Sequence, residues 1–221
     1  MKRSTITIDY LRGGFLALFF MLAGATGAPA LAHPHAWIDL RSTVVLDADG
    51  RVIAIEQEWL FDQFYTVFVT EELSGAAGTR AEALKALARS NLQNLRSYDY
   101  FTEVHAGGTK VPLGTVSEFE SEMRQGRLWM RFVVPLATPV DPTRRSLAFA
   151  VFDPTYYIEI LHLQGDVVDF RGAGVGGCFG RIVPPNPTTE TVLLAQAMDR
   201  NATPDATLGS VFAERVEVTC R

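Results

Sequence analysis

The sequence predicts a mainly β protein of the α+β class, with an antiparallel sandwich-like or strongly curved sheet and one or two packed helices. Short segments rich in Val, Ile and aromatic residues recur at close spacing, separated by Gly, Pro and Asp turn signals. Only the stretch 79–95 has a clear helical period of apolar residues. With 221 residues and 48% hydrophobic residues, the chain is long enough to bury one sizeable core.

Residues 1–32 have the pattern of a secretory signal peptide. Basic residues at the start precede an apolar run from Phe15 to Leu22, and Ala30-Leu31-Ala32 forms a small-x-small cleavage site. The apolar run is shorter than the roughly 20 residues that span a bilayer, so we expect cleavage after Ala32 and no permanent membrane anchor. The mature protein would then be a single domain of residues 33–221 that begins with His33.

The first predicted elements are two strands joined by a tight turn. Residues 37–46 and 51–58 are rich in Val and Ile, and the Asp-Ala-Asp-Gly sequence at 47–50 favours a hairpin. Side chains alternate along a strand, so His33, His35, Trp37 and Asp39 would share one face. The aromatic stretch 60–73 fits either a strand or a buried helix.

A helix and a series of strands follow. Thr79 and Glu82 form a capping box, and Leu84, Ala88, Leu92 and Leu95 line one face of the predicted helix. Five strands are predicted next, over residues 98–106, 110–120, 127–135, 145–152 and 156–163. A Gly-rich loop at 172–180, a Pro-rich break at 184–187, a short helix at about 189–200 and a strand at 211–220 complete the chain.

The two cysteines and the net charge restrict the function classes. Cys178 and Cys220 form an even pair, which in an exported chain predicts a disulfide rather than a thiolate metal site, since no C-x-x-C spacing is present. The formal net charge of −5 becomes more negative when the basic signal segment is removed. A nucleic-acid partner is therefore not expected, because phosphate binding requires clustered Lys and Arg.

The new N-terminus is the main candidate metal site. His33 would offer its free α-amine and its Nδ1 to one ion, and His35 could add a third nitrogen. Pro34 has no amide proton, so it prevents the square-planar site that needs a deprotonated second amide. Nitrogen ligands suit zinc, copper or nickel better than calcium or magnesium. The alternative interpretation is a frayed terminus with incidental histidines.

The remaining ligand is left open by the sequence. His105 and His162 are the nitrogen candidates, and the alternative for each, which is favoured for a lone histidine, is an ordinary strand residue. Asp153 is the oxygen candidate of "FAVFDPTYYIEI", where the alternative is a turn with aromatic packing. Trp37, Asp39, Tyr156 and Tyr157 are expected around the metal rather than on it. The other carboxylates considered are Glu56, Glu58, Asp62 and Glu159.

Four segments carry a family resemblance. "HPHAWID", "EWLFDQFYT", "YFTEV" and "FDPTYYIEI" together resemble the bacterial exported family of unknown function numbered one thousand and seven, over nearly all of the mature chain. The resemblance implies a periplasmic component of an uncharacterised transport system, encoded beside nickel/cobalt-type permeases and linked to zinc or nickel handling. It carries over to five positions: His33, His35, Asp153, Tyr156 and Tyr157.

The leading hypothesis is a periplasmic accessory protein, not an enzyme, that carries a divalent transition metal to or from a membrane permease or transporter component. Zinc is the first choice of metal, with nickel, cobalt or copper as alternatives. A second hypothesis is a secreted copper enzyme that uses an N-terminal histidine brace. A third is an envelope interaction module that binds no metal.

Overall fold

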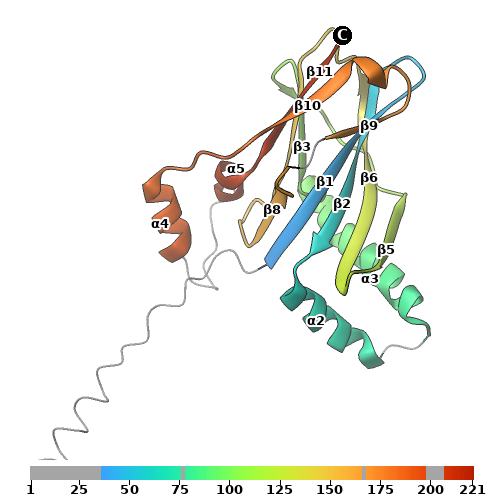
Figure 1. Ribbon diagram of the computed structural model, residues 1–221, viewed down its shortest axis with the longest axis vertical. Helices are drawn as coiled ribbons and strands as arrows, with labels where there is room; N and C mark the ends of the chain where they lie inside the picture. The colour runs from blue at the N-terminus through green and yellow to red at the C-terminus, as the bar shows by residue number, and fades with distance from the viewer. Residues whose placement is uncertain (1–35, 76–77, 166–167, 198–206) are drawn as a thin grey trace, which may run out of the picture. The chain divides into compact units, whose positions relative to one another are not determined.

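The computed structural model describes residues 36–75, 78–165, 168–197 and 207–221, and its strands form two β-sheets (Figure 1). Sheet A contains β1 (Ala36–Leu46), β2 (Val52–Phe61), β5 (Phe119–Arg124), β6 (Arg127–Val140), β8 (Ile158–His162) and β9 (Asp169–Arg171). Sheet B contains β3 (Thr102–Ala106), β4 (Thr109–Lys110), β7 (Leu147–Val151), β10 (Cys178–Val183) and β11 (Arg215–Cys220). The expected mainly β fold is confirmed.

The strand order differs from the chain order in both sheets. Sheet A runs β5-β6-β2-β1-β8, with β9 also paired to β1, and sheet B runs β10-β11-β7-β3-β4. Most neighbours are antiparallel, but β1 pairs in parallel with β8 and with β9. This parallel pairing places residues 158–162 beside the first residues of β1, which directly follow His35 in the chain.

Four helices are described: α2 (Gln63–Glu72), α3 (Arg80–Leu95), α4 (Thr189–Ala197) and α5 (Leu208–Phe212). Short 3-10 turns cover Leu73–Gly75, Arg96–Phe101 and Val175–Gly177. The capping box predicted for α3 is confirmed, because Thr79 and Glu82 bond each other's backbone amides. The ambiguous stretch 60–73 contains a helix, which Asp62 caps by accepting a hydrogen bond from the Tyr65 amide.

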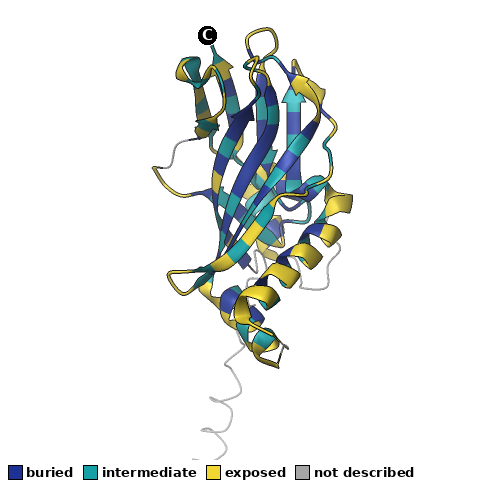
Figure 2. Cartoon of the chain, turned by 90° about the vertical axis from the view of Figure 1, so that its right-hand side faces the viewer, coloured by how far each residue is buried: buried dark blue, intermediate teal, exposed yellow. Residues whose placement is uncertain are grey.

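The core lies between the inward faces of the two sheets. Val44 and Ile55 from sheet A and Val104 and Val216 from sheet B are all fully buried within one apolar cluster. Helix α3 adds its predicted face of Leu84, Ala88 and Leu92 to the same cluster. Figure 2 shows the buried residues along the strands and the exposed turns of α3 outside them.

A buried polar bridge links the sheets through this core. Gln57 on β2 has no exposed surface, and its Nε2 donates to Thr102 Oγ1 on β3 over 2.6 Å. Its Oε1 accepts a hydrogen bond from Trp59 Nε1. Because an unpaired buried amide would be costly, these bonds favour this alignment of β2 with β3 over alternatives.

Three predicted strand boundaries are wrong. The strand expected at 98–106 begins only at Thr102, because Asp99, Tyr100 and Phe101 have left-handed backbone angles. The strand expected at 110–120 breaks into β4 and the start of β5, joined by a segment with a single bridge from Leu113 to Leu136. The last strand starts at Arg215 rather than at 211, because α5 occupies the residues before it.

Two further expectations concern the export segment and the cysteines. Ala32, His33 and His35 lie outside the described residues, so the cleavage site and the domain range 33–221 stay predictions. The disulfide between Cys178 and Cys220 is confirmed, and it joins opposite residues of β10 and β11. In the part of the chain that the structure describes, no helix has the length and hydropathy needed to cross a membrane.

Candidate functional site

The start of β1 and the neighbouring strand β8 bring several predicted site residues together. In the parallel register Ala36 lies opposite Ile158, Trp37 opposite Glu159, and Asp39 opposite Leu161. Trp37 is 43% exposed, whereas its neighbours Ala36 and Ile38 are buried. Trp37, Asp39 and Glu159 therefore lie on the outward face of sheet A, close to the point where the chain arrives from His35.

Asp153 holds the turn that leads into β8. Its Oδ1 accepts hydrogen bonds from the amide and the hydroxyl of Thr155, and its Oδ2 accepts one from the Ile158 amide at 3.1 Å. The residue is buried, with 5% of its surface exposed. Its role as a metal ligand stays a prediction, and in this structure both of its carboxylate oxygens hold the turn.

Tyr156 is locked in place by this turn. Its backbone has a positive φ of 56°, which is costly for a residue with a side chain and persists only where the surroundings impose it. Its ring stacks on Phe212 of α5 with centroids 4.0 Å apart. Gly209 of α5 passes so close to the Asp153 carbonyl that any side chain there would collide with it. The strained turn thus fixes where the Tyr156 hydroxyl points.

The hydroxyl of Tyr156 orients Glu159. It donates a hydrogen bond to Glu159 Oε1 over 3.0 Å. Burial, followed by the charge and the hydrogen bond of Glu159, raises the pKa of Tyr156 above its ordinary value, so the hydroxyl keeps its proton. Tyr157, the other tyrosine of the motif, is 44% exposed. Glu159 is therefore a carboxylate held at a defined position on β8.

A shallow pocket of about 240 Å³ opens beside these residues. Its lining includes Trp37, Asp39, Glu159, Leu161 and His162. The pocket thus combines an aromatic ring and two carboxylates at the edge of sheet A. Its size suits an ion with its ligands or a very small molecule rather than a large substrate.

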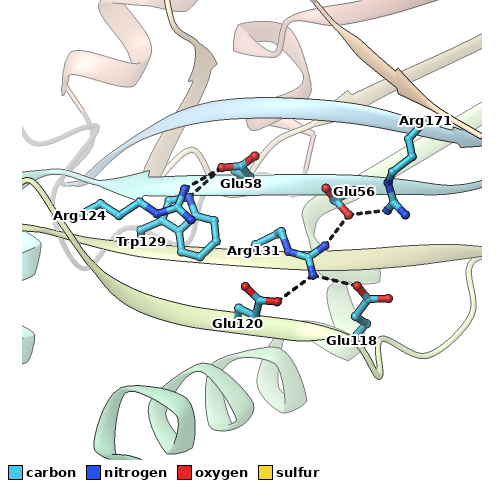
Figure 3. Close-up of polar contacts among 8 residues, drawn as sticks. All are labelled: Glu56, Glu58, Glu118, Glu120, Arg124, Trp129, Arg131 and Arg171. Carbon is cyan, nitrogen blue, oxygen red and sulfur yellow. Dashed lines mark hydrogen bonds and ion pairs between the residues drawn. The ribbon is translucent and has the colours of Figure 1, made fainter. Parts of the chain in front are cut away.

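Several other carboxylates of sheet A are paired with arginines. Figure 3 shows Glu56 between Arg131 and Arg171, at 2.6 and 2.7 Å, and Arg131 in turn contacts Glu118 and Glu120. Burial lowers the pKa of Arg131, but the hydrogen bonds that it donates to Glu118 and Glu120 and the charge of Glu56 outweigh this effect, so the pKa lies above its ordinary value. The cluster therefore contains three carboxylates and two arginines, and both arginines contact Glu56.

A second group on the same face involves Glu58. Its Oε2 accepts hydrogen bonds from Arg124 and from Trp129 Nε1, and the Arg124 guanidinium lies over the Trp129 ring (Figure 3). Since Glu120, Arg131 and Glu58 lie opposite one another on β5, β6 and β2, charges alternate across the strands. Opposite-charge pairs of this kind stabilise the strand register, so a structural role explains the presence of these residues.

Asp39 and Asp62 also have partners. Arg127 contacts Asp39 over 2.6 Å and donates to the carbonyls of Leu60 and Phe61. Asp62 caps α2 and accepts a hydrogen bond from the Trp37 amide over 3.0 Å. Glu159 differs from these carboxylates. Among the described residues it accepts a hydrogen bond from the neutral hydroxyl of Tyr156 and forms no ion pair.

His162 is part of a buried Ser–His–Glu chain. Its Nε2 is 3.0 Å from Ser42 Oγ on β1, and its Nδ1 is 2.8 Å from Glu214 Oε2, which also accepts the His162 amide. These residue types and this order match a hydrolytic triad. Ser42, however, has 0% of its surface exposed, so a substrate could not reach it in this structure. We interpret the chain as a polar link that ties β1 and β8 to the segment before β11.

Removal of the Glu214 carboxylate is expected to destabilise the fold. Glu214→Ala leaves the amide and the ring of His162 without an acceptor, which costs about 2 kcal/mol for buried groups. Glu214→Gln retains one acceptor oxygen and should cost less than half as much. Urea unfolding of the two variants and the wild type measures this difference. Equal midpoints for Glu214→Ala and the wild type would show that the link does not stabilise the fold.

His105 lies apart from this group. It is on β3 in sheet B, and its Nε2 is 2.7 Å from Glu103. Among the described residues, no three His, Cys, Asp or Glu side chains are grouped closely enough to hold a metal ion. The structure therefore brings Trp37, Asp39, Asp153, Tyr156 and Tyr157 to one region, places His162 behind it and leaves His105 on the other sheet. As ligands, His105 and His162 stay predictions.

Sequence reasoning missed some of these roles. No sequence pattern indicated the roles of Ser42 and Glu214. They are 120 and 52 residues from His162 in the chain, and only the fold brings them into contact with it. Glu159 was one of several carboxylate candidates, and its alternation with Tyr157 along a strand was the available signal. Glu159 could be distinguished from the carboxylates that pair with arginine only when the arginines facing each strand were known.

Comparisons with known proteins concern nearly the whole chain. Residues 16–220 match the model of a family described as "Protein of unknown function (DUF1007)". An uncharacterized protein of Haemophilus influenzae is 28% identical over 193 residues, which cover 86% of this chain and 92% of that protein. An uncharacterized 15.5 kDa protein of Spirochaeta aurantia, in the trpE 3' region, is 29% identical over 90 residues, which cover 41% of this chain and 64% of that protein. No solved structure matches the chain.

Proposed function

Because the chain belongs to the DUF1007 family, whose described function is unknown, we propose that it is a periplasmic carrier of divalent transition metal ions that works with a membrane permease or transporter component. In this proposal the α-amine and ring of His33 and the ring of His35 bind the ion, and Glu159 supplies the remaining ligand. Zinc is the proposed cargo, with nickel, cobalt and copper as alternatives. Each part of the proposal has a separate line of support.

The position of Glu159 is the observation that carries the proposal. It lines the pocket beside Trp37 and is held by a protonated tyrosine rather than by an arginine. A carboxylate oxygen binds zinc at about 2.0–2.2 Å. In metal sites a ligating carboxylate is typically also hydrogen-bonded to a neighbouring group, which orients it. Arginines already form ion pairs with Glu56, Glu58 and Asp39, so these carboxylates are less available to a metal ion.

Chain connectivity supports the combination of His35 with Glu159. His35 is bonded to Ala36, which lies opposite Ile158, the residue before Glu159. Successive Cα atoms are about 3.8 Å apart and paired strands about 4.8 Å, which limits the His35-to-Glu159 Cα separation to about 12 Å. The two side chains together with two metal–ligand bonds of about 2 Å can cover a distance of this order.

Compartment and ligand type support the rest of the proposal. A disulfide such as Cys178–Cys220 persists in oxidising compartments, which include the periplasm. Two imidazoles, an amine and one carboxylate suit zinc, and a terminal segment can exchange its ligands with a partner. The predicted signal sequence supplies the route of export.

The role of Glu159 can be tested by substitution. We expect Glu159→Gln to weaken zinc binding about tenfold, because the amide is a poorer ligand than the carboxylate. Tyr156→Phe should have a smaller effect in the same direction, since it removes only the orienting hydrogen bond. Competition titration with a zinc-binding dye, on protein that begins at His33, measures both changes.

A matched control is Glu71→Gln, which removes an exposed carboxylate from α2. It should leave zinc affinity unchanged, and unaltered affinity in Glu159→Gln would exclude Glu159 as a ligand.

The same protein distinguishes the two alternative functions. Reductant-dependent peroxide formation by the copper-loaded protein would favour a copper enzyme, and the absence of binding for all four metals would favour an interaction module.

A further inference from the structure

A groove of about 790 Å³ crosses the outward face of sheet B, away from the proposed metal ligands. Its floor is formed by Ala148 and Ala150 of β7. Residues of β3 form one wall and residues of β11 form the other. The volume lies within the range of about 300–1,000 Å³ that is typical of small-molecule sites.

The groove follows from the strand register. Glu103, Ala150 and Arg215 lie opposite one another on β3, β7 and β11. His105, Ala148 and Glu217 form the next row on the same face. Each row therefore has a short alanine between two long polar side chains. With strands about 4.8 Å apart, the Cα atoms of the two walls are separated by about 10 Å.

The two walls carry opposite charge. On β11, Glu217 is paired with both Arg181 and Arg215, and the Arg181 hydrogen bond is the main reason why the pKa of Glu217 lies below its ordinary value. This wall therefore has one positive charge in excess. On β3, Glu103 pairs among the described residues with His105 alone, over 2.7 Å. The Glu103 carboxylate supplies the negative charge of this wall.

The opposed charges do not neutralise each other across the floor. Within the described residues no ion pair joins Glu103 to Arg215, although they lie in the same row. A ligand with an ammonium group and a carboxylate close together could contact both walls at once. Its remaining part would lie along the floor over Ala148, which is apolar and leaves room for an aliphatic side chain.

We propose that this groove binds a free α-amino acid with an apolar side chain. The ammonium group would pair with Glu103, the carboxylate with Arg215, and the side chain would pack on Ala148. The guanidinium offers two donors in a plane, which suits a carboxylate. This inference does not depend on the proposed metal function, because none of its residues belongs to that site.

Isothermal titration with leucine and two blocked derivatives tests the proposal. Leucine is expected to bind, whereas N-acetyl-leucine, which lacks the ammonium group, and leucinamide, which lacks the carboxylate, should each bind at least tenfold more weakly. Arg215→Gln and Glu103→Gln should each weaken leucine binding about tenfold. Ala148→Leu fills the floor without a change of charge and should abolish binding. Lys85→Gln, on the exposed side of α3, should bind like the wild type.

Three results would overturn the proposal. They are no heat of binding with leucine at 10 mM, equal affinity for the blocked derivatives, and wild-type affinity in Ala148→Leu. Circular dichroism of each variant checks the fold. If Ala148→Leu does not fold, the two charge variants and the blocked derivatives still decide the question, since they do not alter the floor.

Discussion

Protein that carries one additional alanine before His33 is expected to bind zinc at least tenfold more weakly than protein that begins with His33. The addition converts the α-amine of His33 into an amide, which does not bind zinc near neutral pH, and it leaves every side chain of the chain in place. A free α-amine has a pKa of about 7.7–8.0, so a metal ion displaces its proton at small cost near neutral pH. Tenfold corresponds to about 1.4 kcal/mol, which is modest for the loss of one metal ligand.

The control for this experiment is the same alanine added after Arg221. The C-terminal addition keeps length and composition equal and should bind zinc like the unmodified protein. Mass spectrometry establishes the N-terminus of each preparation before the titration. Equal affinity for the two additions would exclude the α-amine as a ligand, whatever the roles of His35 and Glu159.

Loss of the disulfide is expected to cause the largest change in stability. Cys178 and Cys220 are 42 residues apart, and cross-linking a loop of that length contributes about 4 kcal/mol in the chain-entropy model. The double variant Cys178→Ser, Cys220→Ser should therefore unfold at a much lower guanidinium concentration than the wild type. Zinc affinity of the folded variant should be unchanged, because the bridge lies in sheet B and the proposed ligands adjoin sheet A.

Reduction of the wild-type protein provides an independent comparison. Guanidinium unfolding in the presence of a reductant should give a midpoint close to that of the double serine variant. The serine variant should be insensitive to the reductant. If oxidised wild type and the double variant unfolded at the same midpoint, the bridge would make no net contribution to the free energy of unfolding.

Local features of the fold could be predicted from the sequence. The hairpin between β1 and β2 follows from the turn residues 47–50, and Asp47 holds it by accepting the amides of Asp49 and Arg51. Helix α3 follows from its capping box and apolar period. Both depend on interactions between residues close in the chain, which the order of residue types expresses directly.

Features that depend on distant pairings could not be predicted. The parallel alignment of β1 with β8 joins segments more than 100 residues apart, and it decides that Glu159 lies opposite Trp37. The left-handed backbone of Asp99 to Phe101 shortens β3, although none of these residues is glycine. Such angles occur where tertiary contacts impose them, here the burial of Tyr100 and the packing of Phe101 on Trp59.

The candidate site was predicted in part. The motif "FDPTYYIEI" drew attention to a segment whose turn and strand adjoin Trp37 in the structure. The arginines that occupy Glu56, Glu58 and Asp39 come from β5, β6 and β9, and their positions opposite these carboxylates depend on sheet order. Sequence alone therefore could not separate the paired carboxylates from Glu159.

Metal analysis of the protein purified from the periplasm, with its N-terminus established by intact-mass spectrometry, tests the central claim most directly. The proposal predicts a chain that begins at His33 and contains about one equivalent of zinc or another divalent transition metal, which a chelator removes reversibly. A chain that begins at His33 and neither contains such a metal nor binds one on titration would contradict it.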